Sequence, residues 1–320
     1  MMYVLLIAGL ALVLIGAEAL VDGASNLARR WGMSEFVIGL TIVALGTSAP
    51  EMVVSFLSAV EKNSDLAVGN IIGSNNFNTA LILGLSAIIA PVAITRGNLR
   101  RDIPVNIGIT VLLILCGLKH RLFGIGEDGI SRWEGALFLG LFIWYMVSSF
   151  RHDKDNLPGE NRKEAGTKPA SLFRSILFVV AGLAALVIGG RLFVDNAQDV
   201  ARAAGLSDKF IAITVLALGT SLPELATSCI AAAKGKGQLA LGNILGSNTS
   251  NVLLILGGSA VINPLQMAHI SLYDYLAVFL CAFSLVVFAF TWRKNRLDRI
   301  EGVILVLIQI VYFVYLFMTK

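Results

Sequence analysis

One eight-residue motif occurs twice in this chain, each time inside a strongly apolar segment. Residues 44–51 read Ala-Leu-Gly-Thr-Ser-Ala-Pro-Glu, and residues 217–224 read Ala-Leu-Gly-Thr-Ser-Leu-Pro-Glu, an offset of 173 positions (51 to 224). Each copy places a carboxylate, two hydroxyls, a glycine and a helix-breaking proline within a stretch long enough to cross a membrane. We therefore expect the fold to be organised around the meeting of the two copies.

The composition predicts a membrane protein. Hydrophobic residues make up 56% of the chain and charged residues 14%, whereas soluble domains carry about 25% charged residues. A span needs about 20 mainly apolar residues. Ten segments qualify: 2–21, 36–60, 66–90, 103–118, 133–150, 172–194, 210–233, 239–262, 272–292 and 300–317. The lipid bilayer is thus an expected partner. Nucleic acid is not, because no basic stripe is interleaved with aromatic residues.

The repeat extends far beyond the motif and predicts the architecture. Residues 15–91 align without a gap to residues 188–264, with about half of the positions identical. A hydrophilic linker, 151–170, divides the spans five and five. Because five is odd, the second half enters the membrane inverted, as in many secondary transporters. We expect an all-α membrane protein with a central midplane site between two inverted five-helix repeats, 1–150 (motif region 44–78) and 171–320 (motif region 217–251).

The orientation follows from the positive-inside rule. Most lysines and arginines between the predicted spans fall on the side of the linker, and this excess is found in both halves. We therefore expect a multi-pass protein of the cell (inner) membrane, with a cytoplasmic linker and both termini outside.

The duplicated motif carries the sharpest chemical signal. Ionised carboxylates inside a membrane cost several kcal/mol and usually serve a function, so Glu51 and Glu224 are the leading candidates for ligands. Pro50 and Pro223 would free backbone carbonyls upstream, and Gly46 and Gly219 permit a local break. Carbonyl and hydroxyl oxygens could then face a cavity; they belong to Thr47, Ser48, Thr220 and Ser221.

A second polar motif, Gly-Asn-x-x-Gly-Ser-Asn-x-x-Asn, follows in each half. Ser74 and Asn78 are four residues apart and share one helix face, as do Ser247 and Asn251 in the second half. With the first motif, these positions supply only oxygen ligands and no histidine or cysteine. Hard cations such as calcium and sodium prefer this set. One calcium ion would neutralise both glutamates, and an empty site would leave two buried anions, so we expect obligate exchange rather than leak.

These motifs resemble those of the calcium/cation antiporter superfamily, in particular the prokaryotic sodium/calcium exchangers. The resemblance rests on GTSAPE with GNIIGSNNFN and on GTSLPE with GNILGSNTSN, and it covers essentially the whole chain. It implies ten helices, a central diamond of cation positions, and sliding of the first and sixth helices to alternate access. Glu51 and Glu224 would bind calcium with the carbonyls of Thr47 and Thr220. Sodium would use the side chains of Ser48, Ser74, Asn78, Ser221, Ser247 and Asn251 and the carbonyls of Ala44 and Ala217.

Two features of the motifs favour sodium as the counter-ion. Asn251 stands where potassium-dependent relatives carry aspartate. Proton/calcium relatives place a glutamate in the second motif, where this chain has Gly73-Ser74-Asn75. The predicted function is calcium/sodium antiport by a protein that acts as a monomer, with no cofactor beyond the transported ions. A proton/calcium antiporter and a cation channel remain the alternatives. An enzyme is not expected, since no His-Glu-x-x-His, Gly-x-Ser-x-Gly or P-loop motif occurs.

Overall fold

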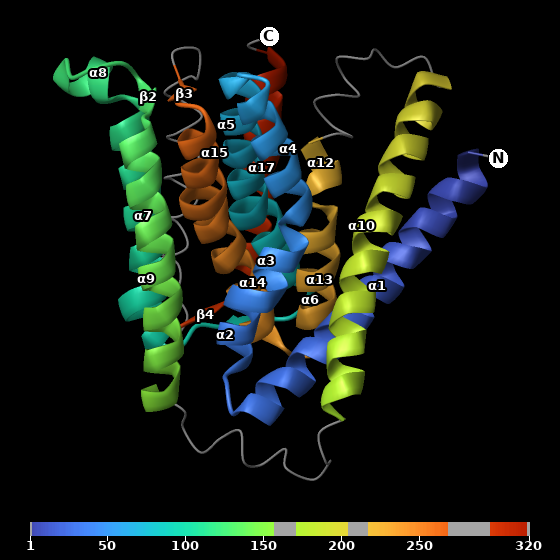
Figure 1. The fold of residues 1–320 in the computed structure, drawn as a ribbon. Helices are drawn as coiled ribbons and strands as arrows, with labels where there is room; N and C mark the ends of the chain where they lie inside the picture. Colours follow the sequence, from blue (N-terminus) through green and yellow to red (C-terminus); the bar gives the residue numbers. More distant parts are fainter. Residues whose placement is uncertain (1, 157–170, 204–216, 268–294, 319–320) are drawn as a thin grey trace.

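The computed structural model describes residues 2–156, 171–203, 217–267 and 295–318, most of them in helices (Figure 1). The start of α1 and the end of α17 lie at one end of the molecule, and the end of α9 and the start of α10 lie at the other. The helices of the first half are α1 (Met2–Trp31), α2 (Glu35–Ile38), η1 (Gly39–Val43), α3 (Ala44–Thr47), α4 (Ala49–Val60), α5 (Ser64–Asn76), η2 (Phe77–Ile82), α6 (Leu83–Ile89), η3 (Asn98–Asp102), α7 (Ile103–Gly117), α8 (Lys119–Phe123) and α9 (Arg132–Asn156).

The second half repeats this order as far as it is described. Its helices are α10 (Leu172–Ala203), α12 (Ala217–Thr220), α13 (Leu222–Ala233), α14 (Gly237–Thr249), η6 (Ser250–Leu256), α15 (Gly257–Ile262) and α17 (Arg299–Met318). Several elements begin at positions 173 residues apart: α4 and α13, α5 and α14, and the π-helical segments η2 and η6. The sequence repeat is therefore also a repeat of local backbone structure.

The described helices are long and apolar enough for an integral membrane protein. Five of them could cross a membrane by length and composition: Met2–Trp31, Ser64–Ile89, Arg132–Asp153, Leu172–Val200 and Gly237–Ile262. Glu35–Thr47 and Ala49–Val60, which bend by 51° where they meet, make a sixth if the pair is counted as one broken span. The predicted span 272–292 lies outside the described residues, as does the first part of the predicted span 210–233.

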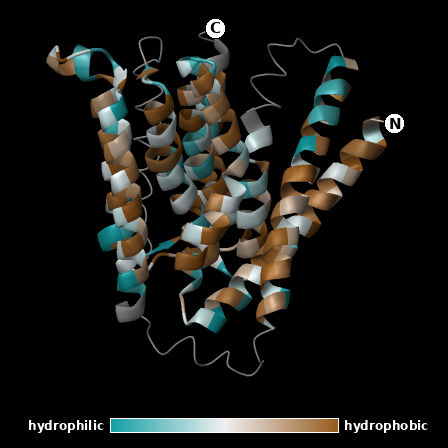
Figure 2. Ribbon diagram, in the orientation of Figure 1, coloured by the Kyte–Doolittle hydropathy of each residue, from teal (hydrophilic) through white to brown (hydrophobic). Residues whose placement is uncertain are grey.

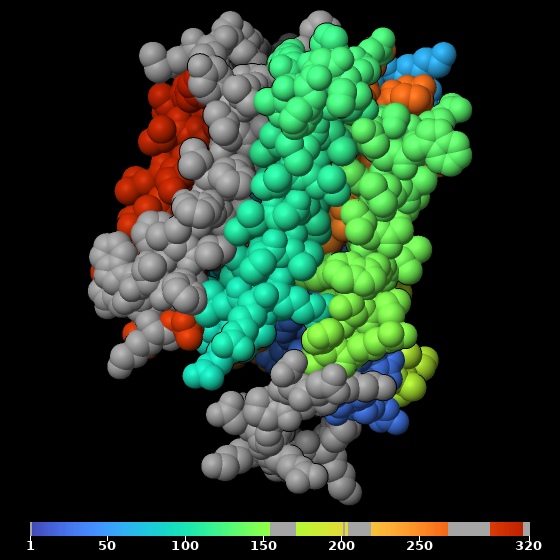
Figure 3. Space-filling model, turned by 90° about the vertical axis from the view of Figure 1, so that its left-hand side faces the viewer, coloured from blue at the N-terminus to red at the C-terminus, as the bar shows by residue number. Residues whose placement is uncertain are grey.

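The spans that carry the second polar motif form the centre of the molecule. In the most apolar window of Gly237–Ile262, 94% of the residues are buried, against 33% in that of Met2–Trp31. Apolar residues predominate along the outer helices α1 and α10 (Figure 2), and α7 and α9 form an outer layer on another side (Figure 3). This distribution suits a protein whose periphery faces lipid and whose centre is polar.

The helices α1 and α10 run antiparallel and pack closely through glycines. A Cβ added to Gly16 would lie 2.8 Å from the carbonyl oxygen of Gly182, and one added to Gly189 would lie 2.9 Å from that of Gly9. Gly9 corresponds to Gly182 in the repeat, and Gly16 corresponds to Gly189. The contact of Gly16 with Gly182 is therefore repeated, with the two helices interchanged, by the contact of Gly189 with Gly9. The first helix of each half thus packs closely against the other.

Two short antiparallel strand pairs connect the halves at their ends. β1 (Val92–Ala93) pairs with β4 (Arg296–Leu297), and β2 (Gly129–Ile130) pairs with β3 (Leu265–Gln266). β1 and β3 are equivalent in the repeat, so each half supplies a strand to the other in the same way. These pairs join segments that are more than a hundred residues apart in the chain.

The close contact of α14 with α2 and η1 predicts that an added side chain at this contact lowers the stability of the protein. A Cβ at Gly242 would collide with the carbonyl oxygen of Phe36. Because backbone cannot move aside as a side chain can, Gly242→Ala should lower the free energy of unfolding by at least the about 1–3 kcal/mol typical of overpacking. The measurement is thermal unfolding of the purified protein in detergent.

The repeat supplies a matched control for this substitution. Gly69 is the equivalent of Gly242, but it is exposed and no described atom lies within 4 Å of an added Cβ. Gly69→Ala should change the free energy of unfolding by no more than about 0.5 kcal/mol. Equal losses in both variants would contradict the packing assigned to Gly242.

Candidate cation-binding site

The two copies of the first motif form two equivalent helix breaks. Ser48 separates α3 from α4 with φ −80° and ψ 9°, and Ser221 separates α12 from α13 with φ −88° and ψ 6°. Pro50 and Pro223 lie in the first turn of the helix that follows each break. Since proline has no N–H, the carbonyls of Gly46 and Gly219 lose their usual helical donor. The backbone conformation is therefore nearly the same at both breaks.

The carboxylates lie directly after the breaks and in the first turns of α4 and α13. Both Glu51 and Glu224 are fully buried. Ser48 Oγ donates a hydrogen bond to Glu224 Oε1 (2.8 Å), and Ser221 Oγ donates one to Glu51 Oε1 (3.2 Å). Each carboxylate is thus held by the serine at the break in the other half. A helix N-terminus also favours a negative charge.

The second carboxylate oxygens have no donor. Glu51 Oε2 and Glu224 Oε2 are buried, and neither forms a hydrogen bond with a described residue. The same holds for Asn78 Oδ1, Asn251 Oδ1 and Ser247 Oγ. Buried oxygens without partners are costly and rare. Four of these atoms form two pairs of repeat equivalents, so the same oxygens are left free in both halves.

Hydrogen bonds between asparagines orient these free oxygens. Asn251 Nδ2 donates to Asn75 Oδ1 (3.0 Å), and Asn78 Nδ2 donates to Asn248 Oδ1 (3.1 Å). Asn248 Nδ2 in turn donates to Thr79 Oγ1 (2.7 Å). Asn251 Nδ2 also donates to Ser74 Oγ (3.3 Å), so both of its amide protons are engaged, whereas Asn78 Nδ2 makes one bond. The Oδ1 atoms of both asparagines remain without a donor. Our sequence reasoning did not assign Asn75 and Asn248 to the site, although both stand in the repeated Gly-Ser-Asn sequence.

The π-helical segments place the asparagines. Asn78 is the second residue of η2 (Phe77–Ile82), and Asn251 is the second residue of η6 (Ser250–Leu256). The wider turn of a π-helix displaces a side chain from the face that an α-helix would give it, and such segments are frequent at functional sites. The sequence spacing alone would put Asn78 directly above Ser74; the extra residue in the turn was not predictable from it.

Other polar residues tie the helices together around the site. Asn243 Nδ2 donates to Ser228 Oγ (2.9 Å), and Asn70 Nδ2 donates to the equivalent Ser55 Oγ (3.1 Å). Thr47 Oγ1 donates to Asn243 Oδ1 (3.2 Å). These bonds engage the hydroxyl of Thr47 in helix packing, so a role of Thr47 in ion binding would fall to its carbonyl.

The structure places the remaining predicted residues in or beside the same region. Ser74 Oγ contacts Ser221 Oγ (3.1 Å) and donates to Glu51 Oε1 (3.4 Å), which joins both halves in one hydrogen-bonded cluster. The carbonyl of Ala44 accepts the Ser48 N–H (3.0 Å). Ala217 begins α12 at the edge of a described segment, and its side chain lies outside the described residues.

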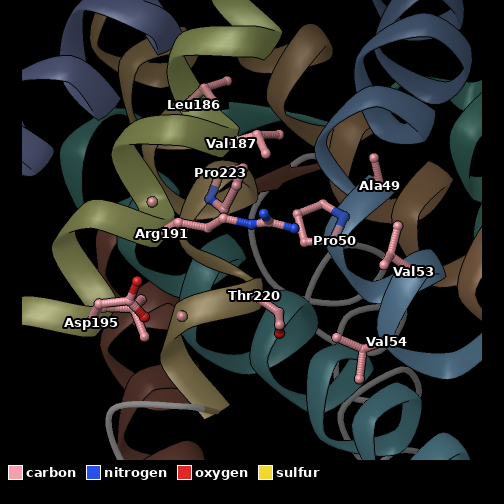
Figure 4. A pocket seen from close by; sticks show the side chains of 13 residues that line it. Ala49, Pro50, Val53, Val54, Leu186, Val187, Arg191, Asp195, Thr220 and Pro223 are labelled. Atoms are coloured by element: carbon pink, nitrogen blue, oxygen red, sulfur yellow. The ribbon is translucent and has the colours of Figure 1, made fainter. Parts of the chain in front are cut away.

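A pocket of about 230 Å³ opens beside the helix breaks (Figure 4). It lies between α4, α10, α12 and α13 and is lined by Pro50, Gly219, Thr220 and Pro223. The side chain of Arg191 extends from α10 toward Pro50 within it. Its lining includes Pro50 and Pro223, the chain neighbours of Glu51 and Glu224, but neither carboxylate.

Comparison with known proteins identifies the family of this chain. The family model described as sodium/calcium exchanger protein matches residues 1–151 and 174–318. The chain belongs to the sodium/calcium exchanger family. It is 37% identical over 321 residues to the putative antiporter CaxA of Alkalimonas amylolytica, which covers 98% of both chains. It is 32% identical over 350 residues to the sodium/calcium exchanger MaX1 of Methanosarcina acetivorans, again covering 98% of both.

Solved structures of the family agree with the fold. A structure of the sodium-calcium exchanger NCX_Mj, soaked with zero Na⁺ and Ca²⁺, superimposes with a TM-score of 0.83 at 30% identity and covers 98% of each chain. This protein is therefore an integral membrane protein of exchanger type, and its relatives are transporters. The resemblance to sodium/calcium exchangers, which the duplicated motifs indicated, is confirmed.

The free carboxylate oxygens predict how the protein responds to calcium. Calcium should raise the melting temperature, because a ligand at 100 times its dissociation constant stabilises the native state by about 2.7 kcal/mol. In cation-free buffer, the double variant Glu51→Gln/Glu224→Gln should melt above the wild type, since it removes two buried anions without counter-charge. It should not respond to calcium. The measurement is thermal unfolding in detergent with and without calcium.

The exposed Glu127 provides the control for this experiment. Glu127→Gln removes one carboxylate far from the helix breaks in the sequence and should respond to calcium as the wild type does. A double variant that calcium still stabilises would show that the cation binds elsewhere.

Proposed function

We propose that this protein exchanges calcium for sodium across the membrane by alternating access to a single central site. The observation that carries the proposal is the set of buried, donor-free oxygens around the two helix breaks, four of which form two pairs of repeat equivalents. Glu51 and Glu224 provide the two negative charges, and Asn78, Asn251 and Ser247 provide neutral oxygens. Membership of the exchanger family supports the same reaction.

The ligand chemistry supports calcium as one of the ions. Calcium takes six to eight oxygen ligands in flexible geometry, and its charge balances the two glutamates. Carbonyls of Thr47 and Thr220 would complete its shell. Sodium ions would then occupy positions around Ser48, Ser74, Asn78, Ser221, Ser247 and Asn251, with carbonyls of Ala44 and Ala217. The neutral Asn251 argues against a potassium site at this position.

Obligate exchange follows from the cost of an empty site. Neither glutamate forms an ion pair with a described residue, so loss of the bound cation leaves two buried anions. Crossing in that state is expensive, because a buried charge without a partner costs several kcal/mol. A second cation must therefore replace the first before the carrier returns.

The proposed architecture is two inverted repeats of five helices, 1–150 and 171–320, joined by the linker 151–170. The antiparallel packing of α1 against its repeat equivalent α10 supports the inversion, because equivalent helices of inverted halves run in opposite directions. The lysine and arginine bias places the linker in the cytoplasm and both termini outside. In this orientation the pocket beside Arg191 opens outward. We expect the monomer to be the functional unit.

Calcium flux into proteoliposomes tests the exchange. Vesicles loaded with sodium should accumulate calcium-45 when diluted into sodium-free buffer. Glu51→Gln or Glu224→Gln should reduce the initial rate by about 100-fold or more, since even residues that only support metal ligands contribute about 10–100-fold. Glu127→Gln should transport normally. Normal exchange by either glutamine variant would reject the site.

The same vesicles distinguish the alternative functions. A proton/calcium antiporter would accumulate calcium when a pH gradient replaces the sodium gradient. A channel would pass calcium without any counter-ion and would show single-channel currents in planar bilayers. Saturable, sodium-dependent uptake without such currents is the result expected for the proposed antiporter.

Cysteine labelling in intact cells tests the proposed orientation. Asp65 and Arg30 are exposed, and they lie at opposite ends of the bundle by the proposed topology. In a variant without native cysteines, Asp65→Cys should react with a membrane-impermeant maleimide in intact cells. Arg30→Cys should react only after the cells are permeabilised. The reverse pattern would place the linker outside.

A further inference from the structure

A group of ion pairs joins α1 to the end of α13. Lys234 Nζ lies 3.1 Å from Glu18 Oε1 and 2.8 Å from Asp22 Oδ1, and Lys236 Nζ lies 3.4 Å from the same Asp22 oxygen. Burial on its own lowers the pKa of Lys234, but hydrogen bonds and charges from Asp22 and Glu18 more than offset it and raise the pKa. Lys234 therefore stays charged and fastens α1 to α13.

The sequence repeat assigns a counterpart to this ion pair with the charges reversed. Glu18 corresponds to Arg191, and Lys234 corresponds to Glu61. Both Arg191 and Glu61 are exposed, and neither forms an ion pair with any residue that the structure describes. The pair of Glu18 with Lys234 is thus reversed in charge in the other half, whereas Asp22 corresponds to Asp195 and keeps its charge.

Identical turns hold Glu61 and Lys234. The N–H groups of Glu61 and Lys234 donate to the carbonyls of Leu57 and Ile230, both at 2.9 Å. Two residues later, the N–H groups of Asn63 and Lys236 donate to the carbonyls of Ser58 and Ala231, both at 2.8 Å. The middle residue has positive φ, 61° at Lys62 and 73° at Gly235. Glu61 therefore stands at the end of α4 in the backbone setting that Lys234 has at the end of α13.

The halves differ in what lies beside these turns. α1 packs along α13, whereas the pocket lies between α10 and α4, and Arg191 points into it toward Pro50 (Figure 4). Glu61 is eleven residues beyond Pro50, or about 16 Å along a helix with a rise of 1.5 Å per residue. Contact between Arg191 and Glu61 therefore requires α10 to close on α4 and to shift along it.

The close packing of α1 and α10 couples the two sides. Their glycine contacts bring the two backbones close together along the crossing. In the inferred movement the pair shifts as one unit. A shift that brings α10 against α4 must draw α1 away from α13.

On the basis of the proposed alternating access, we infer that Arg191 and Glu61 form an ion pair that closes the pocket in the opposite conformation of the carrier. This pair excludes the present pair of Glu18 with Lys234. Each pair therefore stabilises one of the two conformations. Removing one of them should shift the population toward the conformation that the other stabilises.

Labelling of a pocket cysteine measures that population. Val53 is exposed in the pocket, and Val53→Cys in a variant without native cysteines reports access by an impermeant maleimide. Glu61→Gln should raise the labelling rate, and Lys234→Gln should lower it, each by about two- to fivefold, the range for an exposed ion pair. The charge exchange Glu61→Arg/Arg191→Glu should return the rate to that of the parent.

Asp65 provides the matched control, because its repeat equivalent is the uncharged Gln238. Asp65→Asn removes one exposed carboxylate near the same turn and should leave labelling unchanged. The inference is overturned if Glu61→Gln has no effect, if it shifts labelling in the same direction as Lys234→Gln, or if the charge exchange does not restore the rate. Labelling does not require transport. Absence of calcium uptake with the expected labelling would therefore reject the exchange proposal and support the ion pair.

Discussion

Two glutamates, Glu51 and Glu224, are fully buried in the centre of the molecule and have no basic partner among the described residues. Burying an ion without a counter-charge costs several kcal/mol, so the surrounding structure has to limit that cost. It does so by placing each carboxylate in the first turn of a helix and by giving one oxygen of each a serine donor from the opposite half. The other oxygen of each has no donor among the described residues, and in the proposed function it binds the cation.

This constraint explains much of the polar structure around the carboxylates. The breaks at Ser48 and Ser221 make the helix N-termini that receive the charges. The asparagine pairs engage amide protons of Asn78 and Asn251 and leave the Oδ1 atom of each without a donor. In the proposed site these free acceptor oxygens would favour a cation, and the same hydrogen bonds join the helices.

Under the proposed alternating access, the outer helices would move around a fixed centre. α1 and α10 contact each other through glycines, and both helices carry exposed apolar residues. In the proposed mechanism the pair shifts against the central helices. The asymmetry between the ion-paired side at Lys234 and the pocket beside Arg191 distinguishes the two ends of this unit. The repeat in the sequence and the asymmetry in the structure agree with the proposed carrier of two conformations.

The sequence by itself determined the membrane character, the repeat, the two glutamates and the class of ligand, because each depends on residue type and spacing along the chain. Only the tertiary structure decided that Ser48 bonds Glu224 and that Ser221 bonds Glu51, that Asn75 and Asn248 orient the free oxygens, and that Lys234 meets Glu18. Most of these contacts join residues about 170 to 220 positions apart, and the register between two packed halves cannot be read from local periodicity.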